Sequence, residues 1–354
     1  MKAWILHNPN NMTYEETEKP QPKSDEVLVA VKAAGICGSD IPRAFVTGAH
    51  VHPIIIGHEF SGQVCACGTD VDAKWQGKPV GIFPLIPCGT CGPCQKKQYQ
   101  MCRNYNYLGS RCDGGFAEYV AVPEKNLLEL PEGVTYEQAA MLEPMAVSVH
   151  AMRKGMALAG DDFEEPGCCL GTWERLDVLL TMFLKDAGVK DLYVIGNKDA
   201  QKLHVGELGI PEENFCDSRK EDAAAWLMKR TDGVGVDLFF ECVGKNETVQ
   251  HAVELSAPGG SIVFVGNPYS DMTLPKAVYW KILRNELRVS GTWNSSFTGS
   301  EDDDWHYVVR ALAEGRVHPE KLITHRLPME QLMQGLTIMR DKTEDYVKIM
   351  GVNE

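Results

Sequence analysis

The chain has 354 residues, 44% hydrophobic and 24% charged, and is long enough for two globular domains with separate cores. Its formal net charge of -14 disfavours nucleic acid and anionic membranes as partners, because both bind basic surfaces. The opening segment, MKAWILHNPNNMTYEE, lacks the apolar run of a secretory signal, and no stretch reaches the ~18 apolar residues of a membrane span.

Short apolar runs punctuated by Gly and Pro dominate residues 1–150 and predict a β-rich, barrel-like antiparallel fold. Between residues 175 and 290 helices and strands alternate, which predicts a parallel sheet with right-handed crossovers. We expect helices at 178–189, 199–210 and 247–260, the last with a glycine stop, and strands at 191–197, 236–244 and 261–268. Two later helical stretches, 305–315 and 329–341, should return to pack on the first domain.

Four cysteines lie close together in a C-x₂-C-x₂-C-x₇-C run, namely Cys88, Cys91, Cys94 and Cys102. Four thiolates on short loops can surround one tetrahedral zinc ion, and the intervening glycines and proline allow the tight turns. Disulfides or unligated thiols are the alternative. Twelve cysteines without a secretory signal favour a reducing cytoplasm, where metal is the better reason for such a cluster. The run therefore predicts a closed, structural zinc site.

A second set of metal-ligand types is spread over the segments GICGSD, GHEFSG and MLEPMAV. Cys37, His58, Glu59 and Glu143 offer thiolate, imidazole and carboxylate, which suit a zinc ion that keeps a position open and lowers the pKa of a bound alcohol. Ser39 could pass the alcohol proton towards solvent. His58 taken alone would fit a hydrogen-bonded core histidine equally well, and Glu143 before a proline could simply cap the next helix.

These segments resemble the zinc-containing medium-chain dehydrogenases, and within them the polyol group. The resemblance also covers DGGFAEYVAVP, CGSDIPRAFVTGAH, NYNYLGSRCDGGFAEY and LRVSGTWNSS. It implies an α/β architecture, with a GroES-like β-rich zinc domain at 1–148 and 294–354 and a Rossmann-like doubly wound parallel sheet at 149–293. It further implies a cytoplasmic homodimer or homotetramer.

The resemblance also implies the chemistry. Two zinc ions per subunit are expected, one of them on Cys37, His58 and Glu143 with Glu59 as an exchanging or outer partner. The implied reaction oxidises a secondary alcohol of a sugar alcohol, or of its phosphate, to the ketose with hydride transfer to NAD rather than NADP. Neither nucleic acid nor membrane is expected as a partner.

Further candidate residues serve the cofactor and the substrate. The superfamily binds its ligands at the carboxyl ends of the parallel strands. The expected cofactor contacts are Asn197 and Lys202 at the adenosine ribose, and Val265, Gly266, Trp293 and Asn294 near the nicotinamide. Donors to substrate hydroxyls or phosphate could come from Arg43, His50, Arg111, Trp293 and Asn294.

One segment departs from the family pattern. The turn between the first Rossmann strand and its helix falls at Thr172–Asp177, where no glycine lets the backbone approach a pyrophosphate and where Glu174 and Asp177 add negative charge. The preceding DDFEEPGCCLG is a poor strand. Two explanations remain open, a divergent protein with a damaged dinucleotide site or a reading-frame slip across residues 164–177.

Three functions therefore compete. The first is a zinc polyol dehydrogenase, and the second is an inactive or non-enzymatic relative whose nucleotide turn is defective. The third is a zinc hydrolase, since a zinc-bound water is general chemistry. The strand–helix alternation and the GHEFSG context disfavour the hydrolase.

Overall fold

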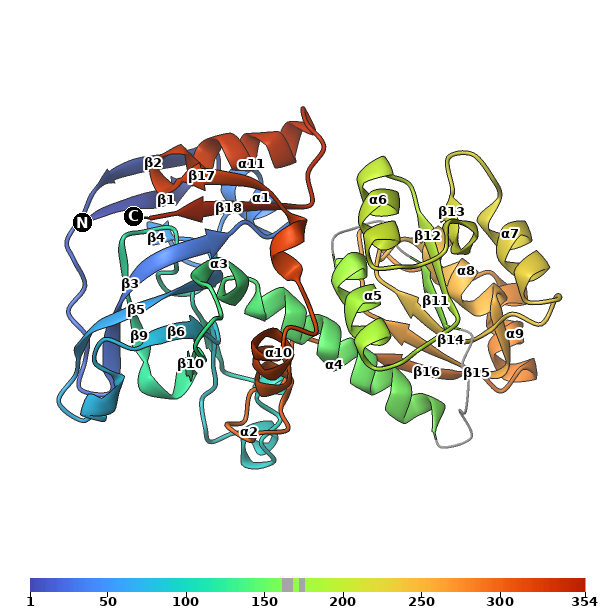
Figure 1. The fold of residues 1–354 in the computed structure, drawn as a ribbon, viewed down its shortest axis with the longest axis horizontal. Helices are drawn as coiled ribbons and strands as arrows, with labels where there is room; N and C mark the ends of the chain where they lie inside the picture. Colours follow the sequence, from blue (N-terminus) through green and yellow to red (C-terminus); the bar gives the residue numbers. More distant parts are fainter. Residues whose placement is uncertain (161–167, 172–175, 354) are drawn as a thin grey trace. The chain divides into compact units, whose positions relative to one another are not determined.

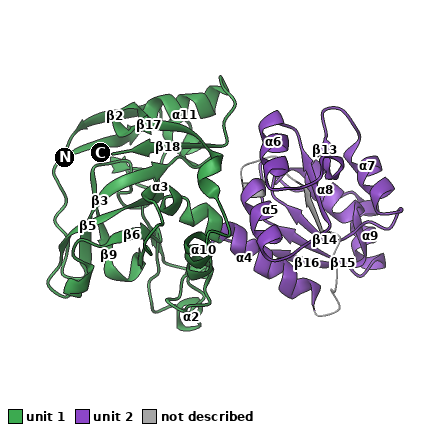
Figure 2. Cartoon of the chain, in the orientation of Figure 1, with its two compact units in different colours: residues 1–146, 295–354 green, residues 147–294 purple. Residues whose placement is uncertain are grey.

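The computed structural model describes residues 1–160, 168–171 and 176–353 (Figure 1). The chain forms two compact units, Met1–Ala146 with Ser295–Glu354 and Val147–Asn294 (Figure 2). The sequence placed the boundaries at 148/149 and 293/294. In the described part of the chain no helix is both long and apolar enough to cross a bilayer.

Unit 1 is built mainly on antiparallel β-structure, as the punctuated apolar runs predicted, and β17 (Ile323–Pro328) with β18 (Lys348–Val352) is its parallel pair. A three-stranded sheet has the order β2 (Asn11–Glu16), β1 (Lys2–Asn8), β4 (Ile54–Ile55). The larger sheet has the order β10 (Leu127–Glu129), β6 (Pro79–Ile82), β5 (Glu59–Cys67), β3 (Glu26–Gly35), β18 (Lys348–Val352), β17 (Ile323–Pro328), and β9 (Tyr119–Pro123) also pairs with β3. A short ladder joins β7 (Leu85–Ile86) to β8 (Asn106–Tyr107).

Apolar residues from alternate strand positions fill the interior of unit 1, because successive side chains of a strand point to opposite faces. Val29 of β3, Phe60 and Val64 of β5 and Val80 of β6 are buried there. The helices are α1 (Asp40–Phe45), α2 (Gly92–Gln95), α3 (Tyr136–Ala139), α10 (Asp304–Ala313), α11 (Leu332–Asp341) and the start of α4 (Leu142–Ala159). The two C-terminal helices, α10 and α11, lie in unit 1.

Unit 2 contains a six-stranded parallel sheet. Its order is β13 (Phe215–Asp217), β12 (Leu192–Gly196), β11 (Cys168–Gly171), β14 (Val236–Glu241), β15 (Ser256–Phe264), β16 (Arg288–Gly291). In chain order this is 3-2-1-4-5-6, the doubly wound arrangement that the alternating pattern predicted. The helices on its faces are α5 (Leu176–Asp186), α6 (Asp199–Glu207), α7 (Ala223–Arg230), α8 (Asn246–Glu254) and α9 (Lys276–Arg284) (Figure 1).

Two local expectations in this unit were wrong. The helix expected at 247–260 ends at Glu254, and SAPGG already belongs to β15. Val236 of β14 pairs with Ser256 of β15, and Leu238, two residues later, pairs with Ser261. The register of the two strands therefore shifts here, and the additional residues of β15 form an irregularity of the sheet. The expectation of a poor strand fails for Cys168–Gly171, whose backbone pairs with both β12 and β14. Residues 161–167 lie outside the described part.

Candidate metal centres and cofactor edge

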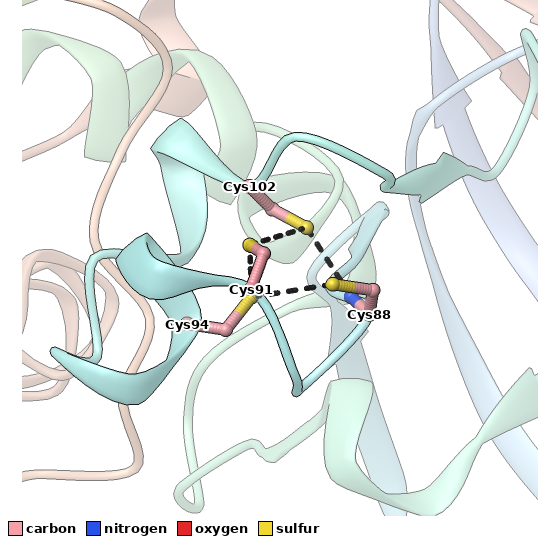
Figure 3. A group of neighbouring side chains, drawn as sticks. All are labelled: Cys88, Cys91, Cys94 and Cys102. Carbon is pink, nitrogen blue, oxygen red and sulfur yellow. Dashed lines mark hydrogen bonds between the residues drawn. The ribbon is translucent and has the colours of Figure 1, made fainter.

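The four-cysteine run forms one compact cluster in the loops that follow β7. Gly89 adopts a positive φ of 74°, and Pro93 stands in the first turn of α2, so the chain can fold back on itself within a few residues. The sulfur atoms of Cys88, Cys91, Cys94 and Cys102 converge on one point (Figure 3).

The spacing of these sulfurs fits a tetrahedral metal. Sγ of Cys91 lies 3.5 Å from Sγ of Cys94 and 3.9 Å from Sγ of Cys102, and Cys88 lies 3.9 Å from Cys94. Four sulfurs bound to zinc at 2.3 Å would lie about 3.8 Å apart. All four thiols are free in the structure, which contains no disulfide, the alternative from sequence, among them. Backbone N–H groups of Thr90 and Cys91 lower the pKa of Cys88 to about 5, which favours the thiolate that a metal needs.

The second ligand set also comes together, from two neighbouring strands. Cys37 follows the end of β3, and His58 and Glu59 stand at the start of β5, which pairs with β3. One ligand atom from each of these three residues lies within 4.8 Å of the others. Ser39 is exposed and its hydroxyl donates to Sγ of Cys37 at 3.3 Å. The three donors differ in type, as expected for an open zinc site.

Asp40, the first residue of α1, contacts two members of this set. Its Oδ2 accepts the backbone N–H of Cys37 at 2.9 Å, and its Oδ1 lies 3.5 Å from Nδ1 of His58. That buried Nδ1 has no hydrogen-bond partner among the described residues. Because the carboxylate faces Nδ1, the other ring nitrogen is left for a metal, which is the usual carboxylate–histidine–metal arrangement.

The charges at this set favour a cation. Burial alone would lower the pKa of His58, but the negative charges of Asp40 and Cys37 outweigh it and raise that pKa to about 10. Burial would raise the pKa of the Cys37 thiol, and the His58 charge reverses the effect and lowers it. The site therefore holds a positive charge strongly, and a divalent metal can supply it. Zinc thus fits the residues present.

Glu143 lies in the first turn of α4, beside this set but outside the 4.8 Å group. Its Oε1 accepts a hydrogen bond from the Tyr107 hydroxyl at 3.3 Å. Burial raises the pKa of its carboxyl, against the charge of His58. The carboxylate grouped with Cys37 and His58 is therefore Glu59, while the predicted ligand Glu143 lies beside the group.

The predicted substrate donors divide into two kinds. The Arg43 guanidinium donates to Oδ1 of Asp40 at 2.6 Å. Arg43 therefore acts on the metal set through Asp40. His50 and Arg111 remain candidates. The Arg111 guanidinium stacks over the Tyr105 ring at 4.7 Å, and its buried Nε has no hydrogen-bond partner within the described residues. Burial and the positive charges of Arg111 and Arg43 lower the pKa of His50, which shows that the three basic groups are neighbours.

All the predicted cofactor residues except Lys202, which lies on α6, follow the carboxyl ends of strands of one sheet. Asn197 directly follows β12, and Val265 and Gly266 follow β15, where their N–H groups donate to the carbonyl of Glu241. Trp293 is exposed and lies just beyond β16, beside Asn294. The Lys202 ammonium is paired with Glu212 at 2.6 Å. Segment 172–175 between β11 and α5, the departing turn, lies outside the described residues.

Fold and site together define a two-domain dehydrogenase with a zinc-binding β-rich domain. The family profiles described as "Alcohol dehydrogenase GroES-like domain" and "Zinc-binding dehydrogenase" match residues 23–132 and 178–314. Galactitol 1-phosphate 5-dehydrogenase of Escherichia coli strain K12 is 34% identical over 337 residues, 95% of each chain.

Solved structures give the same result. The crystal structure of galactitol-1-phosphate dehydrogenase from Escherichia coli superposes with a TM-score of 0.89, at 32% identity and with both chains fully covered. A putative zinc-binding dehydrogenase from Sinorhizobium meliloti, solved bound to NADP, gives 0.88 at 25% identity over 99% of both chains. The chain belongs to the zinc-binding medium-chain polyol dehydrogenase family and is an oxidoreductase.

Sequence reasoning missed Tyr107 and Lys348 of the site, and it placed Asp40 in the open-site segment without giving it a role. Asp40 stands in the quoted GICGSD motif, so its three-residue step from Cys37 was a usable signal. Tyr107 and Lys348 gave none, because their roles depend on strand packing. The Lys348 ammonium, on β18, makes an ion pair with Glu59. Burial lowers the pKa of Lys348 to about 8, against the negative charges of Cys37 and Asp40.

Proposed function

We propose that this enzyme oxidises a secondary alcohol of a sugar alcohol, or of a sugar-alcohol phosphate, to the ketose with hydride transfer to NAD. The observation that carries the proposal is the group formed by Cys37, His58 and Glu59, three unlike donors that converge beside Glu143. Bound there, zinc would supply a Lewis acid that makes a substrate hydroxyl more acidic.

The residues around this group have separate tasks in the proposal. Asp40 orients His58, and the Ser39 hydroxyl, exposed and in contact with the Cys37 sulfur, takes the substrate proton towards solvent. In the closed cluster Cys88, Cys91, Cys94 and Cys102 hold a second, structural zinc ion and take no part in the chemistry.

A phosphorylated substrate is favoured by the basic groups. Arg111 has a buried guanidinium Nε without a partner in the described structure, and the exposed His50 is its neighbour. A planar guanidinium recognises phosphate oxygens with paired hydrogen bonds. We therefore place galactitol 1-phosphate or a similar phosphate ester ahead of free sorbitol or galactitol as substrate, in line with the relative that is 34% identical.

The carboxyl edge of the unit 2 sheet supports a dinucleotide as acceptor. Gly244 and Gly266 let the loops after β14 and β15 touch, since a Cβ on Gly266 would lie 2.3 Å from the Gly244 nitrogen. NAD is proposed rather than NADP, and Asn197 would face its adenosine ribose without the usual carboxylate. Phosphorylated cofactor is the alternative outcome, as in the NADP-bound relative.

The test is a substrate panel with metal analysis. Formation of NADH is followed with galactitol 1-phosphate, galactitol, sorbitol and threonine, on the natural chain and on a variant with a glycine-rich turn at 171–176. Two zinc ions per chain and a preference for the phosphate ester are expected. Turnover by the repaired variant alone would favour the second candidate, an inactive relative with a defective turn. One zinc ion, absent from Cys37 and His58, would contradict the proposal.

A homodimer or homotetramer is proposed from the exposed end of the unit 2 sheet. Edge strand β16 and helix α9 present Val289, Tyr279, Trp280 and Leu283, each at least 42% exposed. Edge strands and apolar patches of this kind are suited to self-association. Sedimentation of the natural chain should give a dimer or larger, and L283E with V289K should give monomers. A monomeric natural chain would refute the assembly.

A further inference from the structure

Two charged side chains meet beside the open metal set. Nζ of Lys348 forms an ion pair with Oε2 of Glu59, and it also donates to the carbonyl of Ile36 at 3.3 Å. The side chains are only 6% and 3% exposed. In the described part of the chain no other cation lies within ion-pair distance of Glu59.

The sheet is built to allow this contact. The strand order is β5-β3-β18, and Gly35 of β3 pairs with Glu59 on one side and with Met350 on the other. Lys348 stands two residues before Met350 and so faces the same side of the sheet. A Cβ on Gly35 would lie 2.6 Å from Cε of Lys348 and 2.7 Å from Oε2 of Glu59. The missing side chain at Gly35 leaves the space in which they meet.

A fully buried ion pair contributes little net stability compared with a well-packed apolar pair, because both ions lose their hydration. Its place beside the open metal set points to another role. The Glu59 carboxylate is also one of the three groups that converge with Cys37 and His58. It therefore lies between an ammonium ion and the position of a metal, and the two cations compete for its charge.

Resting on the proposed zinc-dependent function, we infer that Lys348 is a positioning residue. By binding the Glu59 carboxylate it limits how fully Glu59 ligates a metal at Cys37 and His58, and this leaves a coordination position for the substrate hydroxyl. Loss of the Lys348 ammonium would strengthen metal binding at the open site. It would free the carboxylate and remove a repelling charge, and both changes bind the metal more tightly.

The experiment is a double-mutant cycle on Lys348→Met and Glu59→Gln, with exposed Lys125→Met as the control for a lost positive charge. Release of zinc to a chelator, the visible spectrum of the cobalt form, and kcat are measured on the purified full chain. In the Glu59 background K348M should slow zinc release from the open site about ten-fold, a size typical of outer-shell changes. It should also change the cobalt spectrum and lower kcat.

In the E59Q background the same substitution should change zinc release by less than about three-fold, because the carboxylate through which Lys348 acts is gone. Equal effects in both backgrounds, or faster zinc release in K348M, would overturn the inference and leave a structural ion pair. Gly35→Ala provides a second route if K348M is unstable. It pushes the two side chains apart without removing either charge, and slower zinc release is again expected.

Failure of the inference is distinguishable from failure of the proposed function. If the natural chain binds zinc at Cys37 and His58 but the effects of K348M and E59Q on zinc release are additive, only the role inferred for Lys348 is refuted. If no zinc or cobalt binds there, both fall.

Discussion

Oδ1 of Asp40 lies 3.5 Å from Nδ1 of His58, while the other oxygen of the same carboxylate accepts the backbone N–H of Cys37. One side chain thus fixes two of the three grouped ligands. Arg43, at 2.6 Å from Asp40, holds the carboxylate in its ionised form and adds a third constraint. Burial would raise the pKa of Asp40, but the charges of His58 and Arg43 lower it.

Replacing Asp40 by Asn should weaken zinc binding at the open site by about 10- to 100-fold, the usual size for loss of an outer-shell carboxylate. The amide keeps the shape but removes the charge that orients and polarises His58. Competition with a colorimetric chelator measures the affinity, and the four-cysteine zinc serves as the internal control. Unchanged affinity in D40N, together with an intact fold, would show that Asp40 only holds the backbone of Cys37.

The two metal sets could be predicted from sequence to different extents. Cys88 to Cys102 are local, so their spacing alone determined that the sulfurs could converge. Cys37 and His58 are far apart in sequence and are brought together by the pairing of β3 with β5. Their proximity was therefore predicted from the family resemblance rather than from their spacing. The contact of Asp40 with Cys37 could have been predicted, because the two residues are three apart in sequence and a single turn brings the carboxylate to the Cys37 backbone.

Other features depend on long-range packing. Lys348 is 289 residues from Glu59 and lies in KIMGV, where nothing local distinguishes a buried lysine from a surface one. The end of α8 at Glu254 was missed because SAPGG favours a helix stop locally. Its place in β15 is set instead by pairing with β14, which no local pattern reveals.

Arg111→Ala should raise the KM for galactitol 1-phosphate by about 10- to 100-fold, because a hydrogen bond to a charged group contributes about 1.5–3 kcal/mol. The KM for unphosphorylated galactitol should stay within a factor of about two, since no phosphate is lost. Arg284→Ala, on α9, is the matched control and should change neither value. An equal loss with both substrates would assign Arg111 to packing on Tyr105.

Cys216 should make stability depend on alkaline pH. It is fully buried in β13, and burial raises the pKa of its thiol from the ordinary 9.0 to about 12. Because the folded pKa lies above the unfolded one, the stabilisation is complete below pH 9 and is lost as pH rises through that interval.

The free energy of unfolding, measured with denaturant, should therefore differ between the natural chain and Cys216→Ala by a constant amount at neutral pH. Above pH 9 the difference should shrink, by at most about 1.4 kcal/mol per pH unit for one proton. Val236→Ala truncates the same core without a titrating group, so its difference should stay constant. A constant difference for C216A as well would refute the assigned cause.

The dinucleotide turn sets the last expectation. Thr172, Trp173, Glu174 and Arg175 stand between β11 and α5, where a pyrophosphate needs backbone N–H groups, small residues and no negative charge. NADH should therefore bind the natural chain at least about ten-fold more weakly than it binds a repaired variant, a difference of about 1.4 kcal/mol.

The repaired variant carries T172L, W173G, E174T, R175I and L176G, which gives G-L-G-T-I-G after β11. Titration of NADH fluorescence measures both affinities, and E174Q alone separates the effect of charge from that of the glycines. If the natural chain saturates at micromolar NADH, the turn binds the cofactor in its present form and the defect is refuted. If only the repaired chain saturates, the gene should be resequenced across residues 164–177, because a reading-frame slip requires codons that yield the glycine-rich turn when shifted.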